Sequence, residues 1–148
     1  MITQYNGVGA IITNSDKSLF YVQEKDEEYR FKEFIGCSSF FGGGIEKDDK
    51  NEFEALKREI NEELPTVSNI LFNGAIKKVD AFIIKHGEEN FTFTLFEIII
   101  PNEELLKFEN ISPTEGRGKL LKLQELQKQK WVWNLQVAIN KYLEKVVN

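Results

Sequence analysis

The chain has 148 residues, which is the length of one ordinary domain. Its 24 acidic and 19 basic residues leave a net charge of −5, so a surface for the phosphate backbone of duplex nucleic acid is not expected. One cysteine and one histidine exclude an internal disulfide and argue against a zinc site built from several thiolates.

The N-terminal third has the composition of short strands and a loop. Residues 7–13 and 19–23 are β-rich and flank a cluster of turn-forming residues, which predicts a hairpin. Residues 24–37 are charged and aromatic without a period and are expected to form a loop. A short apolar stretch, residues 38–41, leads into three consecutive glycines at 42–44.

The clearest element is a helix over residues 51–64. Its apolar residues have the spacing of one helical face, which contains Phe53, Leu56, Ile60 and Leu64. Either Asp49 or Asn51 can cap its start, and Pro65 ends it.

The second half alternates strands and helices. Residues 70–85 and 91–100 are strand-like around a five-residue hairpin loop at 86–90. Residues 119–123 predict one more strand, and residues 135–147 predict an amphipathic helix. The inward face of that helix contains Leu135, Ala138, Ile139, Tyr142 and Val146. The order predicts one α/β domain over residues 1–148, with a mixed sheet.

Four glutamates share one side of the 51–64 helix. At 100° per residue they fall within an arc of about 100° beside the apolar stripe, and they are Glu52, Glu59, Glu62 and Glu63. Glu59 and Glu63 are four residues apart, a destabilising like-charge pair that a divalent cation would relieve. Oxygen ligands of this kind suit Mg²⁺ or Mn²⁺. The alternative is a solvated acidic face, and the glycines upstream together with Arg58, four residues before Glu62, favour a site.

Residues 43–66 resemble the Nudix box, whose pattern is G-x5-E-x7-R-E-U-x-E-E-x-G-U with U apolar. The run Arg58-Glu59-Ile60-Asn61-Glu62-Glu63 matches this pattern fully. Asp49 stands where the first glutamate belongs, the spacer after it is one residue longer, and Pro65-Thr66 replaces glycine and an apolar residue. Glu52 competes with Asp49 for the supporting role.

The resemblance implies a Nudix-type α/β/α sandwich that hydrolyses a nucleoside diphosphate linked to another group, with Mg²⁺ or Mn²⁺ as cofactor. It places the metal on Glu59, Glu62 and Glu63 and on the carbonyl of Gly42 or Gly43, with Arg58 orienting the glutamates. Metal ions would neutralise the charge of the diphosphate, orient the attacking water and stabilise the leaving group.

The family usually recruits one more carboxylate from outside the box as a ligand or general base. Glu115, in the loop before the last predicted strand, resembles the position used by the nucleotide-cleaning branch, and the alternative is a solvated loop residue. Glu97 is the competing candidate because it points with apolar side chains on a strand, where a carboxylate needs a partner.

Substrate recognition is less specified by the sequence. The segment 29–34 interleaves aromatic and basic residues, and Arg30 and Phe31 are the candidates for stacking a base and contacting phosphates. Ordinary loop packing is the alternative. Trp131 and Trp133 can line a pocket or belong to the core, and we assign no role to His86.

The leading hypothesis is a Mg²⁺-dependent pyrophosphohydrolase acting on a nucleoside triphosphate or a related nucleoside diphosphate derivative. The alternatives are a non-catalytic module that senses a nucleotide or nucleotide sugar, and a metal-free interaction domain. No apolar run reaches the roughly 20 residues of a membrane span, and the N-terminus lacks the basic start of a secretion signal. We therefore expect a cytoplasmic protein without membrane or duplex nucleic acid partners, and a homodimer is compatible with the sequence.

Overall fold

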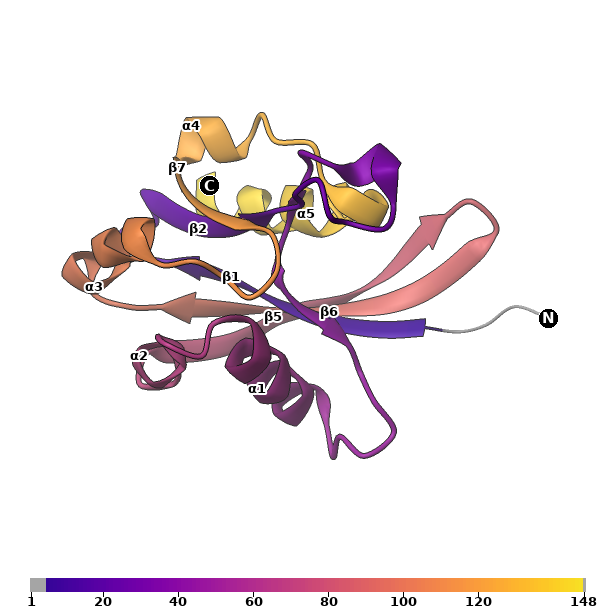
Figure 1. The fold of residues 1–148 in the computed structure, drawn as a ribbon, viewed down its shortest axis with the longest axis horizontal. Helices are drawn as coiled ribbons and strands as arrows, with labels where there is room; N and C mark the ends of the chain where they lie inside the picture. Colours follow the sequence, from indigo (N-terminus) through magenta and orange to yellow (C-terminus); the bar gives the residue numbers. More distant parts are fainter. Residues whose placement is uncertain (1–4, 148) are drawn as a thin grey trace.

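The computed structural model describes residues 5–147 and forms three layers, with helices on both faces of one sheet (Figure 1). The strands are β1 Tyr5–Thr13, β2 Leu19–Glu24, β3 Ser38–Ser39, β4 Phe41–Gly44, β5 Ala75–His86, β6 Glu89–Ile99 and β7 Arg117–Lys122. The helices are α1 Glu52–Glu63, α2 Ser68–Phe72, α3 Asn102–Leu106, α4 Leu123–Leu126 and α5 Gln136–Val147. Short 3-10 turns are η1 Lys32–Phe34, η2 Lys107–Asn110 and η3 Val132–Asn134. No helix within the described range is both long and apolar enough to cross a bilayer.

The sheet is mixed, as predicted. Its central strands follow the order β3-β2-β1-β6-β5, with β1 parallel to β6 and the other neighbours antiparallel. The predicted N-terminal hairpin is confirmed near its turn, where Ile12 pairs with Tyr21. Farther from the turn, β1 pairs instead with β4, and Val8 lies opposite Gly43. The glycine strand is thereby hydrogen-bonded to the middle of the sheet.

Side chains that alternate along the strands form two separate cores. Val8 and Ala10 on β1 face the core that contains α1, α2 and α3, whereas Ile11 faces the core that contains α5. On β6, Phe96 belongs to the first core and Phe93 to the second. A two-residue period on strands buried from both sides produces this division. Position along a strand therefore decides which helix layer a side chain meets.

The 51–64 helix prediction is confirmed, with small corrections at its edges. Asn51 is the N-cap, and its side chain accepts a hydrogen bond from the backbone N–H of Glu54 at 2.9 Å. Leu56 and Ile60 are fully buried, but Phe53, expected on the buried stripe, is 36% exposed and touches Phe96 at the edge of the core. The strand 119–123 and the helix 135–147 correspond to β7 and α5 with shifted ends.

The prediction of a strand from residue 70 is wrong for its first five residues. Residues 68–72 form α2, in which Leu71 is fully buried, and β5 begins only at Ala75. A short apolar run satisfies a helix as well as a strand, so its period does not decide between them. The predicted five-residue hairpin loop is also shorter, because His86 pairs with Glu89 and Gly87 takes a positive φ of 62° in a two-residue turn.

Replacing Leu56 by Ala should destabilise the protein by about 2–5 kcal/mol, because it leaves a cavity where α1 meets the sheet. Urea unfolding measures this loss. Leu106→Ala is the control: Leu106 is 52% exposed, and the change should stay within about 0.5 kcal/mol. Equal losses for the two variants would contradict the core described here.

Candidate active site

The glycine strand β4 lies directly against α1, and two of its glycines leave space that a side chain would fill. A Cβ added at Gly43 would lie 2.6 Å from Oε1 of Glu59, so any side chain would displace that carboxylate. A Cβ at Gly42 would collide with the carbonyl oxygen of Val8 on the neighbouring strand. Gly43 therefore allows the carboxylate of Glu59 to reach the backbone of the sheet, and Gly42 allows β4 to lie close to β1.

Glu63 is the most buried of the helix glutamates, with 9% of its surface exposed. Its Oε1 accepts a hydrogen bond from the backbone N–H of Gly42 at 2.8 Å, and its Oε2 accepts one from Nε2 of Gln23 at 2.8 Å. Burial raises the pKa of Glu63 to about 8, the nearby charge of Glu59 adds to this effect, and the bond from Gly42 opposes it. A positive ion bound at this carboxylate would favour its charged form and offset the free-energy cost of burying it.

Arg58 joins the helix to the segment before it. Its guanidinium donates to both oxygens of Asp49 at 3.1 and 2.9 Å, to the carbonyl of Gly44 at 2.9 Å and to Oε1 of Glu59 at 3.0 Å. This contact holds the pKa of Asp49 below its ordinary value. Glu52 lies instead 4.0 Å from Lys78 on β5. Asp49, and not Glu52, is therefore the supporting carboxylate that Arg58 binds.

The remaining glutamates differ in exposure. Glu59 is largely buried, and burial raises its pKa while Arg58 opposes the shift. The side chain of Glu62 is 61% exposed and lies 3.6 Å from Arg58. Among residues 5–147, no three acidic, histidine or cysteine side chains form a ready-made ligand cluster. The box carboxylates accept hydrogen bonds from Arg58, Gly42 and Gln23. Their oxygens are hard ligands of the kind that Mg²⁺ prefers.

The two carboxylates outside the box lie in different places. The loop that carries Glu115 is tied to the end of α1, because Thr114 donates from its backbone N–H to the carbonyl of Glu63 at 2.9 Å and from Oγ1 to that of Glu62 at 2.7 Å. Glu97 is fully buried on the opposite, α5 side of the sheet, where it accepts a 2.6 Å hydrogen bond from Tyr142. Only Glu115 is near the box.

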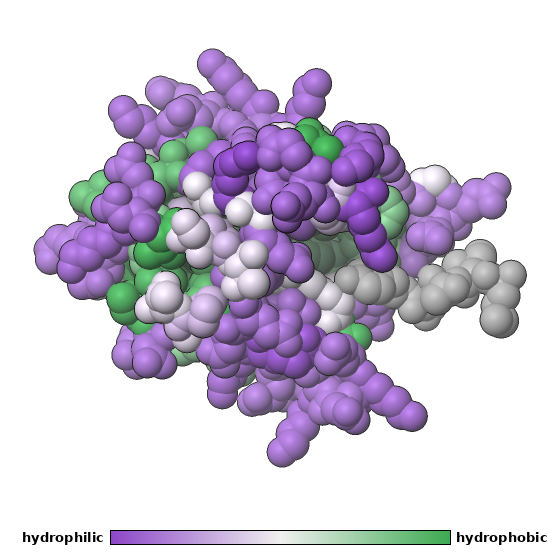
Figure 2. Space-filling model, in the orientation of Figure 1, coloured by the Kyte–Doolittle hydropathy of each residue, from purple (hydrophilic) through white to green (hydrophobic). Residues whose placement is uncertain are grey.

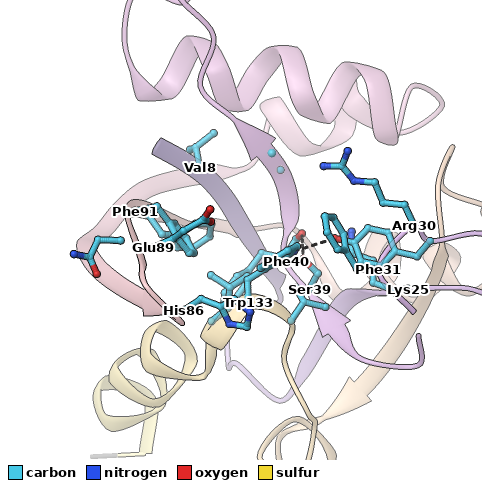
Figure 3. Close-up of a pocket in the computed structure, with 18 residues that line it drawn as sticks. Val8, Lys25, Arg30, Phe31, Ser39, Phe40, His86, Glu89, Phe91 and Trp133 are labelled. Atoms are coloured by element: carbon cyan, nitrogen blue, oxygen red, sulfur yellow. Dashed lines mark hydrogen bonds between the residues drawn. The ribbon is translucent and has the colours of Figure 1, made fainter. Parts of the chain in front are cut away.

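A cavity of about 530 Å³ opens beside the glycine strand, and Gly42 and Gly43 form part of its lining. In the space-filling view, hydrophilic side chains surround a less polar hollow near the middle of this face (Figure 2). The close-up shows Lys25, Arg30 and Phe31 on one side of the cavity, and Glu89 and Phe91 on the other (Figure 3). The predicted candidates Arg30 and Phe31 both line it.

Aromatic rings make up much of the cavity wall. The ring centre of Trp133 lies 4.6 Å from the ring centre of Phe31, 4.8 Å from that of Phe34 and 5.0 Å from that of His86. Its Nε1 donates a 2.9 Å hydrogen bond to the hydroxyl of Tyr29. Trp133 therefore belongs to the cavity, whereas Trp131 is 7% exposed and belongs to the second core.

Sequence reasoning missed Lys25, His86 and Glu89 as lining residues. They come from a loop, a hairpin and the strand after it, and only the folded sheet brings them together. A smaller cavity of about 350 Å³ contains Glu115 and shares Lys25 and Arg30 with the larger one. The basic side chains thus lie between the aromatic cavity and the loop of Glu115.

Comparisons with known proteins identify the family and the fold. A family model described as NUDIX domain matches residues 3–141. The D-alanine–D-alanine ligase of Campylobacter jejuni subsp. doylei is 31% identical over 83 residues, which are 56% of this chain and 23% of that protein. The chain therefore spans about a quarter of that relative.

Solved structures share the fold at low identity. A MutT protein from Methanosarcina mazei Go1 has a TM-score of 0.66 and 13% identity, with 97% of this chain and 96% of that chain covered. The NUDIX domain of Shewanella oneidensis NrtR complexed with ADP ribose has a TM-score of 0.68 and 12% identity, with coverage of 99% and 90%. NrtR complexed with a 27mer DNA has a TM-score of 0.66 and 14% identity, with coverage of 95% and 61%. These structures show the same fold, and the family-model match over residues 3–141 shows that the chain belongs to the NUDIX domain family.

Proposed function

We propose that the protein is a Mg²⁺-dependent pyrophosphohydrolase that cleaves a diphosphate bond in a nucleoside triphosphate or a related nucleoside diphosphate derivative. The observation that carries this proposal is a shared wall: Gly42 and Gly43, which contact Glu63 and Glu59, also line the aromatic cavity. A nucleotide bound in the cavity would have its phosphates next to the box.

The residues that would hold the metal are Glu59, Glu62 and Glu63, the carbonyl of Gly43, and Glu115. Mn²⁺ suits the same oxygen ligands. The bound cation would offset the negative charge of diphosphate and glutamates and lower the pKa of a bound water. The carboxylate of Glu59 can approach Gly43 because glycine has no Cβ. This proximity would let the Glu59 carboxylate and the Gly43 carbonyl oxygen bind the same cation.

The chain's own residues would act around that site. Arg58 anchors Glu59 and Asp49, so that α1 and the segment before it keep a fixed distance. Glu59 and Glu62 are the catalytic carboxylates of the box, and Glu115 is the added ligand or general base, held near them by the Thr114 contacts. Positioning by these groups would make the attack on phosphorus effectively intramolecular.

Substrate binding is assigned to the cavity. Phe31 and Trp133 offer aromatic faces for a base, and Arg30 and Lys25 offer charge for phosphates. Arg30 also lies over the ring of Phe31, with its guanidinium carbon 4.6 Å from the ring centre. A nucleotide has both a base that can stack on the aromatic rings and phosphates that can bind the basic side chains.

A screen of nucleoside triphosphates, dinucleoside polyphosphates, ADP-ribose and nucleotide sugars, with Mg²⁺ and with EDTA, tests the proposal. We expect Mg²⁺-dependent hydrolysis of at least one of them, read as phosphate, pyrophosphate or nucleoside monophosphate. Tight binding without cleavage would instead support a sensing module. The NrtR structures include ADP ribose and DNA complexes, so duplex DNA belongs in the binding assay as well.

Glu62→Gln should lower turnover by at least ~10²-fold, about 2.7 kcal/mol of barrier, because it removes a metal-binding charge. The metal-free fold should be unchanged or slightly more stable, since a charge beside Glu59 and Glu63 is lost. Steady-state kinetics and thermal melts measure both. Glu144→Gln, an exposed change on α5, is the matched control. If Glu62→Gln turned over substrate at the parental rate, Glu62 would not be a catalytic metal ligand.

Glu115→Gln should lower turnover per folded molecule far more than Glu97→Gln, because only Glu115 lies on the loop tied to α1. Glu97 contacts Lys17 at 3.2 Å and Tyr142 at 2.6 Å, so its substitution should instead lower the melting temperature. Activity and melts of the two variants separate these effects. If Glu97→Gln lowered turnover more than Glu115→Gln, the additional ligand or base would be Glu97 on β6.

A further inference from the structure

Gln23, in the middle of the sheet, is 1% exposed and has each end of its amide engaged. Its Nε2 donates to Oε2 of Glu63 at 2.8 Å and to the backbone carbonyl of Glu115 at 3.1 Å. Its Oε1 accepts from Nζ of Lys25 at 2.8 Å. One buried amide therefore connects a box glutamate, the loop of Glu115 and a cavity lysine.

Lys25 determines which way this amide points. An ammonium group has three donors and no acceptor, so it can bind only the oxygen of the Gln23 amide. The NH₂ end is then directed at Glu63 and the Glu115 carbonyl, both of which are acceptors. If the amide were flipped, its oxygen would face the Glu63 carboxylate and its NH₂ group would face Lys25. The hydrogen bonds to Glu63, to the Glu115 carbonyl and from Lys25 would all be lost, and such a loss is costly for a buried amide.

The hydrogen bonds to Glu63 orient its carboxyl group without a direct ion pair. Its two hydrogen bonds come from neutral donors, the N–H of Gly42 and the NH₂ of Gln23, one on each oxygen. A carboxylate has about four lone-pair sites, so two sites remain for another ligand. Glu59, by contrast, is bound by the cationic Arg58 at 3.0 Å. Glu63 therefore has a fixed orientation and two acceptor sites left for an ion.

We propose that Gln23 is a positioning residue for metal binding: oriented by Lys25, it holds the Glu63 carboxylate and the Glu115 loop in the arrangement that receives the cation. This inference rests on the proposed function, since it assigns Gln23 to the same site. Neutral partners that orient metal-binding carboxylates contribute strongly to affinity and activity.

The test compares Gln23→Met with Gln129→Met. Gln129 is a matched control because its Oε1 accepts from Nζ of Lys119 at 2.7 Å and its Nε2 donates to the carbonyl of Glu125 at 3.0 Å, with no box residue involved. Both changes keep side-chain length and remove the donor. Free Mn²⁺ followed by electron paramagnetic resonance gives the metal dissociation constant, and kinetics at saturating metal give kcat and KM.

We expect Gln23→Met to raise the Mn²⁺ dissociation constant by about 10-fold to 100-fold and to lower kcat by a similar factor, with KM for the nucleotide within about 3-fold of the parent. Gln129→Met should leave all three values unchanged. Gln23→Leu, which also lacks a donor and adds no charge, should behave like Gln23→Met. Parental Mn²⁺ affinity in both Gln23 variants would overturn the proposal.

Lys25 supplies a second test that does not depend on the folding of the Gln23 variants. If Lys25 acted only through its charge, Lys25→Met would tighten Mn²⁺ binding, because a cation near Glu63 would be lost. If Lys25 orients Gln23, the same change weakens Mn²⁺ binding, and Lys25→Arg retains it. Tighter binding in Lys25→Met would overturn the orienting role.

Failure of the inference is distinguishable from failure of the proposed function. A parent protein that binds Mn²⁺ but hydrolyses no nucleotide would refute the hydrolase, and weaker Mn²⁺ binding in Gln23→Met would still support the positioning role. If the parent hydrolyses nucleotide and Gln23→Met has the same Mn²⁺ affinity and turnover as the parent, the positioning role alone is refuted. A parent that binds no Mn²⁺ would refute both.

Discussion

The close approach of two glutamate carboxylates to a side-chain-free strand is the constraint on which the rest of the site depends. The backbone N–H of Gly42 binds Glu63, and a Cβ at Gly43 would occupy the space of the Glu59 carboxylate. Because β4 pairs with β1 in the middle of the sheet, its backbone is held rigidly. The glutamates therefore meet a fixed surface, which is the kind of preorganisation a metal-dependent reaction requires.

Two buried carboxylates on opposite faces of the sheet show how differently this fold treats charge. Glu97 has Lys17 at 3.2 Å, Lys77 at 3.6 Å and the hydroxyl of Tyr142 at 2.6 Å, so its charge is paired within the protein. Glu63 has neutral donors at hydrogen-bonding distance, and none of the ion pairs in the described part of the chain includes it. Burial without a paired charge is expensive. Of the two, Glu63 is therefore the carboxylate whose burial a bound cation would offset.

Much of this arrangement could be predicted from the sequence, because the relevant signals are local. The apolar spacing of Leu56 and Ile60 predicts α1, and the spacing of Arg58 and the glutamates identifies the box. The sequence leaves Asp49 and Glu52 as rivals for the supporting carboxylate, because the spacer before Arg58 is one residue longer. The loop conformation decides between them: Asp49 contacts Arg58, and Glu52 lies beside Lys78.

Other features depend on contacts distant in the chain and have no local signal. His86, Phe31 and Trp133 meet because a hairpin, a loop and a 3-10 turn converge on one edge of the sheet. The role of Gln23 depends on Glu63, 40 positions away, and a glutamine in a strand carries no pattern of its own. The helix at 68–72 was missed because its five residues are too few for a period to show.

Backbone amide resonances recorded during a Mn²⁺ titration test the central claim most directly, because a bound paramagnetic ion broadens nearby nuclei. We predict early and selective broadening at Gly42, Gly43 and Glu59 to Glu63, and at Glu115 on the loop beside them. Resonances of Glu97 and Tyr142, across the sheet, should persist at the same Mn²⁺ concentration. Broadening that begins elsewhere, or spreads uniformly over the acidic surface, would contradict a cation site between α1 and the glycine strand.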